Sequence, residues 1–212
     1  RDAQESRGLG DVYKRQQRYM LGPTLLRLSN VYLDTLDVRA RAMRWTQELA
    51  RRTNLPVRLG APHFHEVLVI HHDLRRDDSQ QMLETGVAIP AHASAMGKVL
   101  LAHDLGFQRT VFERPLPSLT GDTITDIARL MLELPAIAER GSASETDEAV
   151  LGESSVAAPV SDASNDIVAA VAVVMPTSHA PASDAVLNAL RETARNICLL
   201  YTSDAADERS SV

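Results

Sequence analysis

Cysteine is almost absent from this 212-residue chain, which has one, Cys198, near its C-terminal end. A single cysteine builds no disulfide framework within a chain, and we expect no thiolate nucleophile and no cysteine-ligated metal site. Long hydrophobic runs are absent as well. None approaches the roughly eighteen residues that a transmembrane helix needs, and no signal peptide is visible. We expect a cytoplasmic protein with no membrane association.

An excess of positive charge is also lacking. The chain has 22 basic and 28 acidic residues, a formal net charge of −6 at pH 7. Affinity for DNA comes largely from neutralising phosphates, so an acidic chain is a poor DNA binder on its own. The length suits one domain with a full hydrophobic core.

The two ends of the chain are related at the level of DNA. Residues 6–16 read SRGLGDVYKRQ, and residues 198–208 read CLLYTSDAADE. The codons GAT GTG TAT AAG AGA CAG encode the end of the first segment. Their reverse complement, shifted by one reading frame, encodes the start of the second. Such inverted ends resemble translated sequencing-library adapters, which have to be left out of reasoning about a fold. We expect residues 1–16 and 198–212 to be artefacts of this kind.

Between these ends, hydrophobic periodicity predicts both helices and short strands. No βαβ unit repeats, which favours an α+β fold with helices flanking a mostly antiparallel sheet. The predicted helices are 24–36, 38–53 (capped by Asp37), the stretch after Pro90 that carries Val99–Leu101, 123–140 (capped by Asp122 or Thr123, interrupted near Pro135 and stopped at Gly141) and 181–197. The predicted strands are 57–59, 67–70, 86–89 and a hairpin within 154–175 with its turn at 162–166.

The most distinctive segment is GVAIPAHASAMGKVLLAH, residues 86–103. Pro90 ends an extended stretch, and the small residues 93–95 lead into a helix. The first N–H groups of a helix have no partner within it and carry partial positive charge, so an anion is stabilised there. Small side chains would let a ligand approach the backbone. The alternative is a closely packed helix start without a ligand.

Other polar patterns are less specific. Gly97-Lys98-Val99 fails as a phosphate loop, because the earlier glycine and the final Ser or Thr are missing, so Lys98 is interpreted as a surface or interface charge. His63 and His65 would face the same side of a strand, and His71 and His72 follow, which makes a metal site conceivable. Without cysteine or an HExxH helix, histidines without a metal are favoured, and no Ser–His–Asp arrangement can be argued.

Three stretches in register carry a family resemblance. They are YMLGP at 19–23, IPAHASAMGKVLLA at 89–102, and the run from Thr146-Asp147-Glu148 through Gly152 and AAPV at 157–160 to Ala169-Ala170. Together they resemble the effector-binding domain of the IclR family of bacterial transcription regulators. The resemblance implies a fold related to GAF and PAS sensors, with residues 17–36 as the linker helix region and 37–197 as the effector-binding domain. We expect the winged-helix DNA-binding domain of the family to be absent from this chain.

The resemblance also implies a ligand pocket between the sheet and the loop before the Ser94 helix. A small organic acid would bind the N–H groups of Ala95 and Met96. Glu145 and Ser155 would supply polar contacts, and Ile89, Met96 and Ala172 apolar walls. Two residues depart from the family pattern, Met96 being larger and Glu145 longer than expected. For the acidic residues around Glu145, a solvated acidic loop is the alternative interpretation.

Function follows from the resemblance as an expectation. The chain would be a sensor without enzymatic activity or cofactor, forming homodimers or homotetramers and reaching operator DNA only through the missing domain. Two alternatives stay open. One is a GAF-like metal-dependent hydrolase that uses the histidines or the acidic loop. The other is a dimerisation module whose pocket is collapsed around Met96.

Overall fold

The computed structural model describes residues 12–15, 18–21, 37–75, 82–162 and 164–209. The chain divides into two units, Arg1–Ala40 and Arg41–Val212. In the first unit, β1 (Val12–Arg15) pairs antiparallel with β2 (Arg18–Leu21). The helix predicted over residues 24–36 lies outside the described residues.

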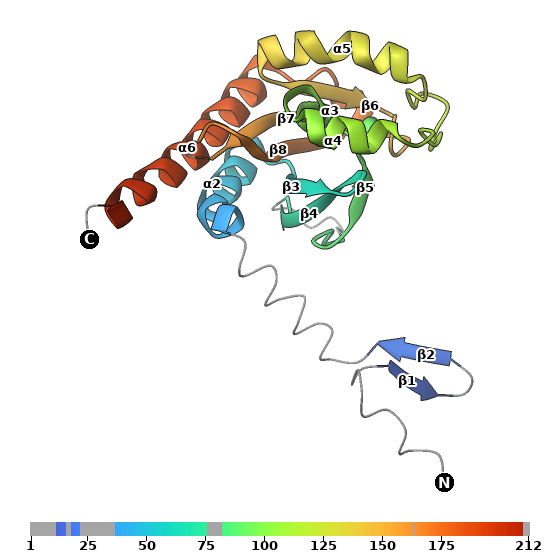
Figure 1. Ribbon diagram of the computed structural model, residues 1–212, viewed down its shortest axis with the longest axis horizontal. Coiled ribbons are helices and arrows are strands. Elements are labelled where there is room, and N and C mark those ends of the chain that lie inside the picture. The colour runs from blue at the N-terminus through green and yellow to red at the C-terminus, as the bar shows by residue number, and fades with distance from the viewer. Residues whose placement is uncertain (1–11, 16–17, 22–36, 76–81, 163, 210–212) are drawn as a thin grey trace. The chain divides into compact units, whose positions relative to one another are not determined.

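The second unit is built on one six-stranded sheet of order β5-β4-β3-β8-β7-β6 (Figure 1). Every neighbouring pair of strands in it is antiparallel, which confirms the predicted fold class. The strands are β3 (Val57–His63), β4 (Glu66–Asp73), β5 (Ala88–Pro90), β6 (Ala143–Thr146), β7 (Glu153–Ser161) and β8 (Ile167–Pro176).

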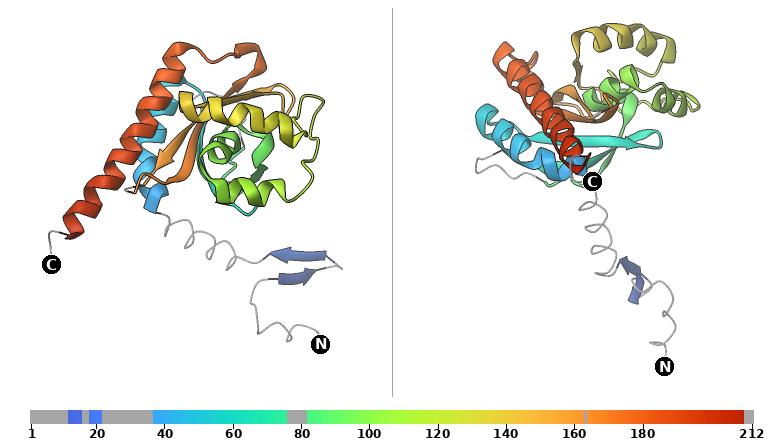
Figure 2. Two further views of the ribbon diagram at one scale, coloured as in Figure 1. Left: turned by 45° about the horizontal axis from the view of Figure 1, so that its top comes forward. Right: turned by 60° about the vertical axis from the view of Figure 1, so that its left-hand side comes forward.

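Helices cover both faces of this sheet (Figure 2). On one face lie α2 (Asp37–Thr53) and α6 (Asp184–Arg209), joined by an ion pair between Arg52 and Glu192 at 2.8 Å. On the other lie α3 (Ala95–His103), α4 (Leu105–Phe112) and α5 (Ile127–Arg140). Two short 3₁₀ turns, η1 (Ala91–Ala93) and η2 (Thr177–His179), complete the described elements.

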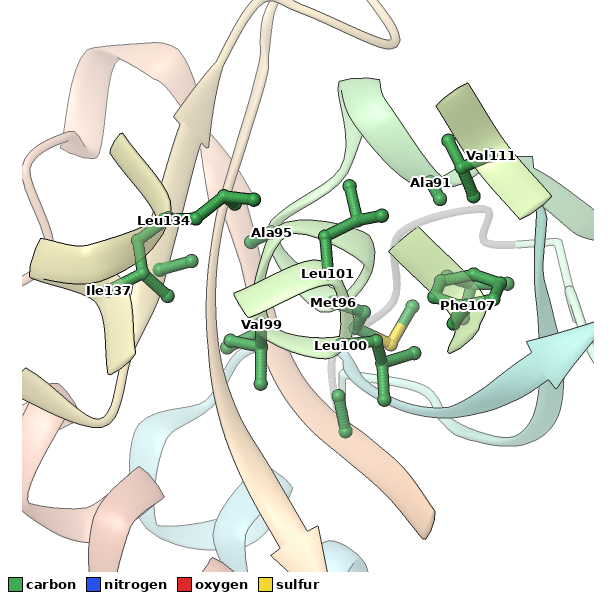
Figure 3. Packing of buried hydrophobic residues seen from close by; sticks show 14 of the residues in the cluster. Ala91, Ala95, Met96, Val99, Leu100, Leu101, Phe107, Val111, Leu134 and Ile137 are labelled. Atoms are coloured by element: carbon green, nitrogen blue, oxygen red, sulfur yellow. The ribbon is translucent and has the colours of Figure 1, made fainter. Parts of the chain in front are cut away.

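The main hydrophobic core surrounds α3. Its residues 95–101 are all buried, because α3 lies between the sheet and two other helices. Leu134 and Ile137 of α5 flank it on one side, and Phe107 and Val111 of α4 flank it on the other (Figure 3). The predicted helix start is confirmed: Ser94 caps α3 by accepting a hydrogen bond from the N–H of Gly97 at 3.1 Å.

Two details of α5 differ from the sequence prediction. Its N-cap is Asp126, which accepts from the N–H of Ala128 at 2.8 Å, and neither Asp122 nor Thr123 caps it. Pro135 lies inside α5 without interrupting it. The proline removes one backbone hydrogen bond, but the apolar side of α5 packs into the core and outweighs that loss.

The predicted ends of two other elements are confirmed. Gly141 stops α5 in the left-handed conformation, with φ of 63°. The turn between β7 and β8 closes through Asp162, whose N–H donates to the carbonyl of Asp166 at 2.9 Å. The carboxylate of Asp162 also accepts from the N–H groups of Ser164 and Asp166, as expected of an aspartate in a turn.

Candidate functional site

A cavity of about 230 Å³ lies between the sheet, the start of α3 and the loop that joins β6 to β7. Five of the six predicted binding residues line it, namely Ile89, Met96, Glu145, Ser155 and Ala172. The remaining lining residues are Arg58, Glu84, Val87, Ser94, Ala149, Val150, Glu153 and Val174. Residues far apart in the sequence are therefore gathered at the place where the resemblance implies a pocket.

Strand register explains how the sheet presents its share of this lining. Ser155 pairs with Glu145 of β6 on one side and with Val174 of β8 on the other. Two positions further along β8, Ala172 pairs with Arg58 of β3. Because alternate residues of a strand point to the same face, these side chains form one continuous patch beneath α3.

Glu145 is a buried polar group in the cavity wall, held by two hydrogen bonds. It is only 5% exposed. Its carboxylate accepts one hydrogen bond from the hydroxyl of Ser155 at 2.6 Å and another from the N–H of Glu148 at 3.2 Å. Burial raises the pKa of the Glu145 carboxyl, and these hydrogen bonds offset that effect only in part. The cavity therefore holds a carboxyl group that is fixed in place and whose pKa is raised by burial.

Because this pKa is raised, Glu145→Gln is expected to change the free energy of unfolding by an amount that depends on pH. The native state binds the carboxyl proton more tightly than the unfolded chain, whose glutamate pKa is about 4.3. The contribution of Glu145 to stability is therefore present below that pH and is lost as pH rises through the native pKa. Glutamine does not titrate, so we expect the stability of the variant relative to wild type to increase with pH over this window.

Urea unfolding at a series of pH values measures this difference. Glu139→Gln, at an exposed position on α5, is the matched control for removing one negative charge. A Glu145→Gln difference that stayed constant with pH, or that followed the control, would contradict a raised native pKa for Glu145.

Ala95 and Met96 occupy different places at the start of α3. The side chain of Ala95 is packed in the core and does not line the cavity, so only its backbone could meet a ligand there. Met96 lines the cavity opposite Gly60, which follows a bulge in β3. A Cβ added at Gly60 would lie 3.0 Å from the Met96 sulfur and 2.4 Å from a methyl of Val67. The missing side chain at position 60 thus makes room for the large one at position 96.

Arg58 is a lining residue that the sequence analysis missed. It is buried, and its guanidinium forms ion pairs with Glu84 and with Glu153, the latter at 2.8 Å. Both carboxylates also line the cavity, so the positive charge of Arg58 is already balanced by two negative ones. The available signal was a charged residue inside a short apolar strand, where an unpaired charge would be strongly unfavourable.

Lys98 was interpreted as a surface or interface charge, but it is buried within the domain. It is 1% exposed and forms an ion pair with Glu148, in the loop next to Glu145, while its Nζ lies 3.7 Å from a carboxylate oxygen of Glu133 on α5. The N–H of Glu148 also donates to Glu145. A polar connection therefore runs from the cavity through Glu148 to α3 and α5.

The histidines do not form a metal site in the described part of the chain. His63 ends β3, and His65 lies beyond it in the turn to β4, so the two do not share a strand face as expected. His63 instead stacks edge-on against Phe64, with ring centroids 4.6 Å apart. No group of three or more His, Cys, Asp or Glu residues among those described is arranged to hold a metal.

Residues 30–199 match the model of a protein family described as "Bacterial transcriptional regulator IclR C-terminal". The chain belongs to the IclR family. It is 41% identical to the glycerol operon regulatory protein of Streptomyces griseus, over 84% of this chain and 71% of that protein. With the protein of the same name from Streptomyces coelicolor it shares 40% identity, over 74% of this chain and 61% of that protein. The chain thus spans between three-fifths and three-quarters of these two relatives.

A solved structure in this family is similar in fold. The inducer-binding domain of the PobR transcription factor from Acinetobacter superposes with a TM-score of 0.66 at 28% identity, covering 74% of this chain and 94% of that one. The chain is an IclR-type effector-binding domain, as predicted. Its relatives are regulators and not enzymes, which confirms that part of the prediction and leaves the hydrolase alternative without support. Within the described residues, no helix is long and apolar enough to cross a membrane.

Proposed function

We propose that this IclR-family domain senses a small hydroxylated organic acid in the cavity between the sheet and α3. The observation that carries the proposal is the pairing of Glu145 and Ser155 in a buried wall close to the start of α3. A ligand hydroxyl can donate to the Glu145 carboxylate. The N–H groups of Ala95 and Met96, at the positive end of the helix, attract the acid group.

The charges around Arg58 favour a position for the acid group away from this arginine. Its guanidinium is held between Glu84 and Glu153, so an acid approaching it meets two carboxylates as well as one cation. The start of α3 carries no such competing carboxylate of its own. We therefore place the acid at α3 and the hydroxyl groups toward Glu145, with Ile89, Met96 and Ala172 as apolar walls.

The cavity volume and the relatives agree with a small ligand. At about 30 Å³ per water molecule in the liquid, 230 Å³ corresponds to about eight waters, which is room for a small ligand. A double mutant of the PobR inducer-binding domain was solved with 3-hydroxybenzoic acid, a hydroxylated acid, and two relatives are named for glycerol operons, glycerol being a small polyol. Both 3-hydroxybenzoic acid and glycerol are small molecules that carry hydroxyl groups.

Regulation would follow from the effector's preference for one arrangement of subunits. We propose that the domain forms homodimers or homotetramers in the cytoplasm and reaches operator DNA through a separate DNA-binding domain. Bound effector then shifts the population of assembled states by its difference in affinity for them. We also propose that residues 17–36 are the linker region, that 37–197 are the sensing domain, and that 1–16 and 198–212 are translated adapter sequence. The family match over residues 30–199 includes all of residues 37–197, which supports the assignment of that stretch to the sensing domain.

Ala172→Leu tests the ligand site. The added side-chain atoms would enter the cavity from β8, so we expect the variant to lose at least about tenfold in effector affinity, or about 1.4 kcal/mol of binding free energy. Thermal shift with glycerate, 3-hydroxybenzoate, pyruvate and glycerol identifies the effector class, because a ligand that binds the native state stabilises it.

Ala136→Leu, the same change at an exposed position of α5, is the matched control and should bind normally. Equal affinity in the two variants would place the ligand elsewhere. If no probe stabilised the wild-type chain, the collapsed dimerisation module would become the better interpretation. Stabilisation by glycerol but not by any acid would refute the acid group at α3.

A further inference from the structure

A second cavity, of about 290 Å³, lies on the opposite face of the β6–β7 pair. Its sheet wall includes Ser144, Thr146 and Ser154, which alternate along their strands with the residues that face the first cavity. The other wall comes from α6 and the segment before it, with Pro181, Leu187 and Arg191. The remaining lining residues are Arg140, Ser142, Ala143, Ser155, Val156, Met175 and Ala182.

Two arginines from different helices converge on one buried serine in this cavity. Arg140, the last residue of α5, donates from Nε to the carbonyl oxygen of Ser142 at 2.6 Å. Arg191 of α6 donates from its guanidinium to the hydroxyl of Ser142 at 3.2 Å. Each arginine has five N–H donors, so most of their donors stay available to a ligand. Ser142 therefore holds both guanidinium groups at one end of the cavity.

No acidic side chain among the lining residues of the second cavity neutralises the charges of Arg140 and Arg191. No Asp or Glu is among the lining residues, and no ion pair within the described residues involves Arg140 or Arg191. Arg58 in the first cavity shows the contrast, since two glutamates hold it. The C-terminal end of α5 contributes only about half a negative charge, which two full guanidinium charges outweigh. The cavity thus places two positively charged guanidinium groups close together, where they attract an anion.

We propose that this second cavity binds a small organic anion, a carboxylate or phosphate with a short apolar body. Arg140 and Arg191 take the anionic group in charge-assisted hydrogen bonds. Leu187, Pro181 and Met175 contact the apolar part. The site is separate from the effector cavity and does not depend on the effector proposal.

The two cavities share one wall, which gives the second site a route to the first. The hydroxyl of Ser154 faces the second cavity and donates to the backbone carbonyl of Glu145 at 2.7 Å, while the Glu145 side chain faces the first cavity. A ligand that shifts Ser154 therefore acts on the residue that we assign to effector binding.

The test is a titration of the whole chain with inorganic phosphate and with butyrate, at constant ionic strength made up with chloride. Affinity is measured by isothermal titration calorimetry in wild type, in Arg140→Gln/Arg191→Gln and in Arg129→Gln, the control for removing a positive charge from an exposed position of α5. We expect the double variant to bind at least about tenfold more weakly, because it loses two charge-assisted contacts. We expect the control to bind as wild type does.

A further variant distinguishes binding at this site from binding in the effector cavity. Ala172→Leu, which fills the first cavity, should leave phosphate and butyrate affinity unchanged if they bind at the arginines. Equal binding by the double variant and the control would overturn the proposal, provided that circular dichroism shows both to be folded. Sedimentation velocity at several protein concentrations measures whether the anions change the oligomeric state. If the anions change it only at high protein concentration, a second copy of the chain occupies the arginines, and this result would also overturn the proposal.

Discussion

Gly97→Ala is expected to lower the free energy of unfolding by about 3 kcal/mol or more, the upper end of the usual range for overpacking a core. A Cβ at position 97 would lie 2.0 Å from the carbonyl oxygen of Ala91 and 2.4 Å from its Cα. These are backbone atoms of η1 and cannot rotate away, so α3 and η1 must separate. This separation would disturb the buried side chains around α3 and the wall of the effector cavity next to Met96.

Urea unfolding measures the effect, and Gly121→Ala is the matched control. Gly121 has nothing within 4 Å of its added Cβ, so the same substitution there should change stability by less than about 0.5 kcal/mol. If Gly97→Ala were as stable as the control, the close packing of α3 on η1 could not be a structural requirement.

Lys98→Met has the second large expected effect, a loss of about 3–5 kcal/mol, because removing one partner of a buried ion pair leaves the other charge uncompensated. The side chain of Lys98 is 2% exposed and that of its partner Glu148 is 9% exposed. Burial already raises the pKa of Glu148, and Lys98 is the main influence that lowers it. Without the lysine, Glu148 is expected to stay protonated over more of the pH range.

The double variant Lys98→Met/Glu148→Gln separates the charge from the packing. Neutral glutamine next to methionine removes the uncompensated charge, so the double variant should recover much of the stability lost in Lys98→Met. Equal stability of the single and double variants would show that the loss comes from packing around α3. In that case the ion pair itself would contribute little.

Local signals in the sequence predicted the elements whose ends are set by their own residues. Gly141 ends α5 and Asp162 closes the turn between β7 and β8, because each acts through its immediate neighbours. The antiparallel α+β arrangement followed from the order of these elements. Pro135 was misjudged because the packing of α5 on the core, which is not a local property, outweighs one lost hydrogen bond.

The effector cavity was predicted in outline, through the family resemblance and not through periodicity. What the sequence did not show are the charged side chains paired across long separations. Arg58 binds glutamates 26 and 95 positions away, and Lys98 binds one 50 positions away. A single sequence gives no measure of which charges meet, so Lys98 was assigned to the surface or an interface. The convergence of Arg140 and Arg191 was missed for the same reason.

The contact between Gly60 and Met96 has a consequence for how this cavity can evolve. A larger residue at position 60 would press on both Val67 and the thioether of Met96, and a smaller residue at position 96 would leave a void against bare backbone. Neither position can change far while the other stays fixed. Related regulators that recognise different ligands should therefore differ at positions 60 and 96 together. The two positions are expected to co-vary.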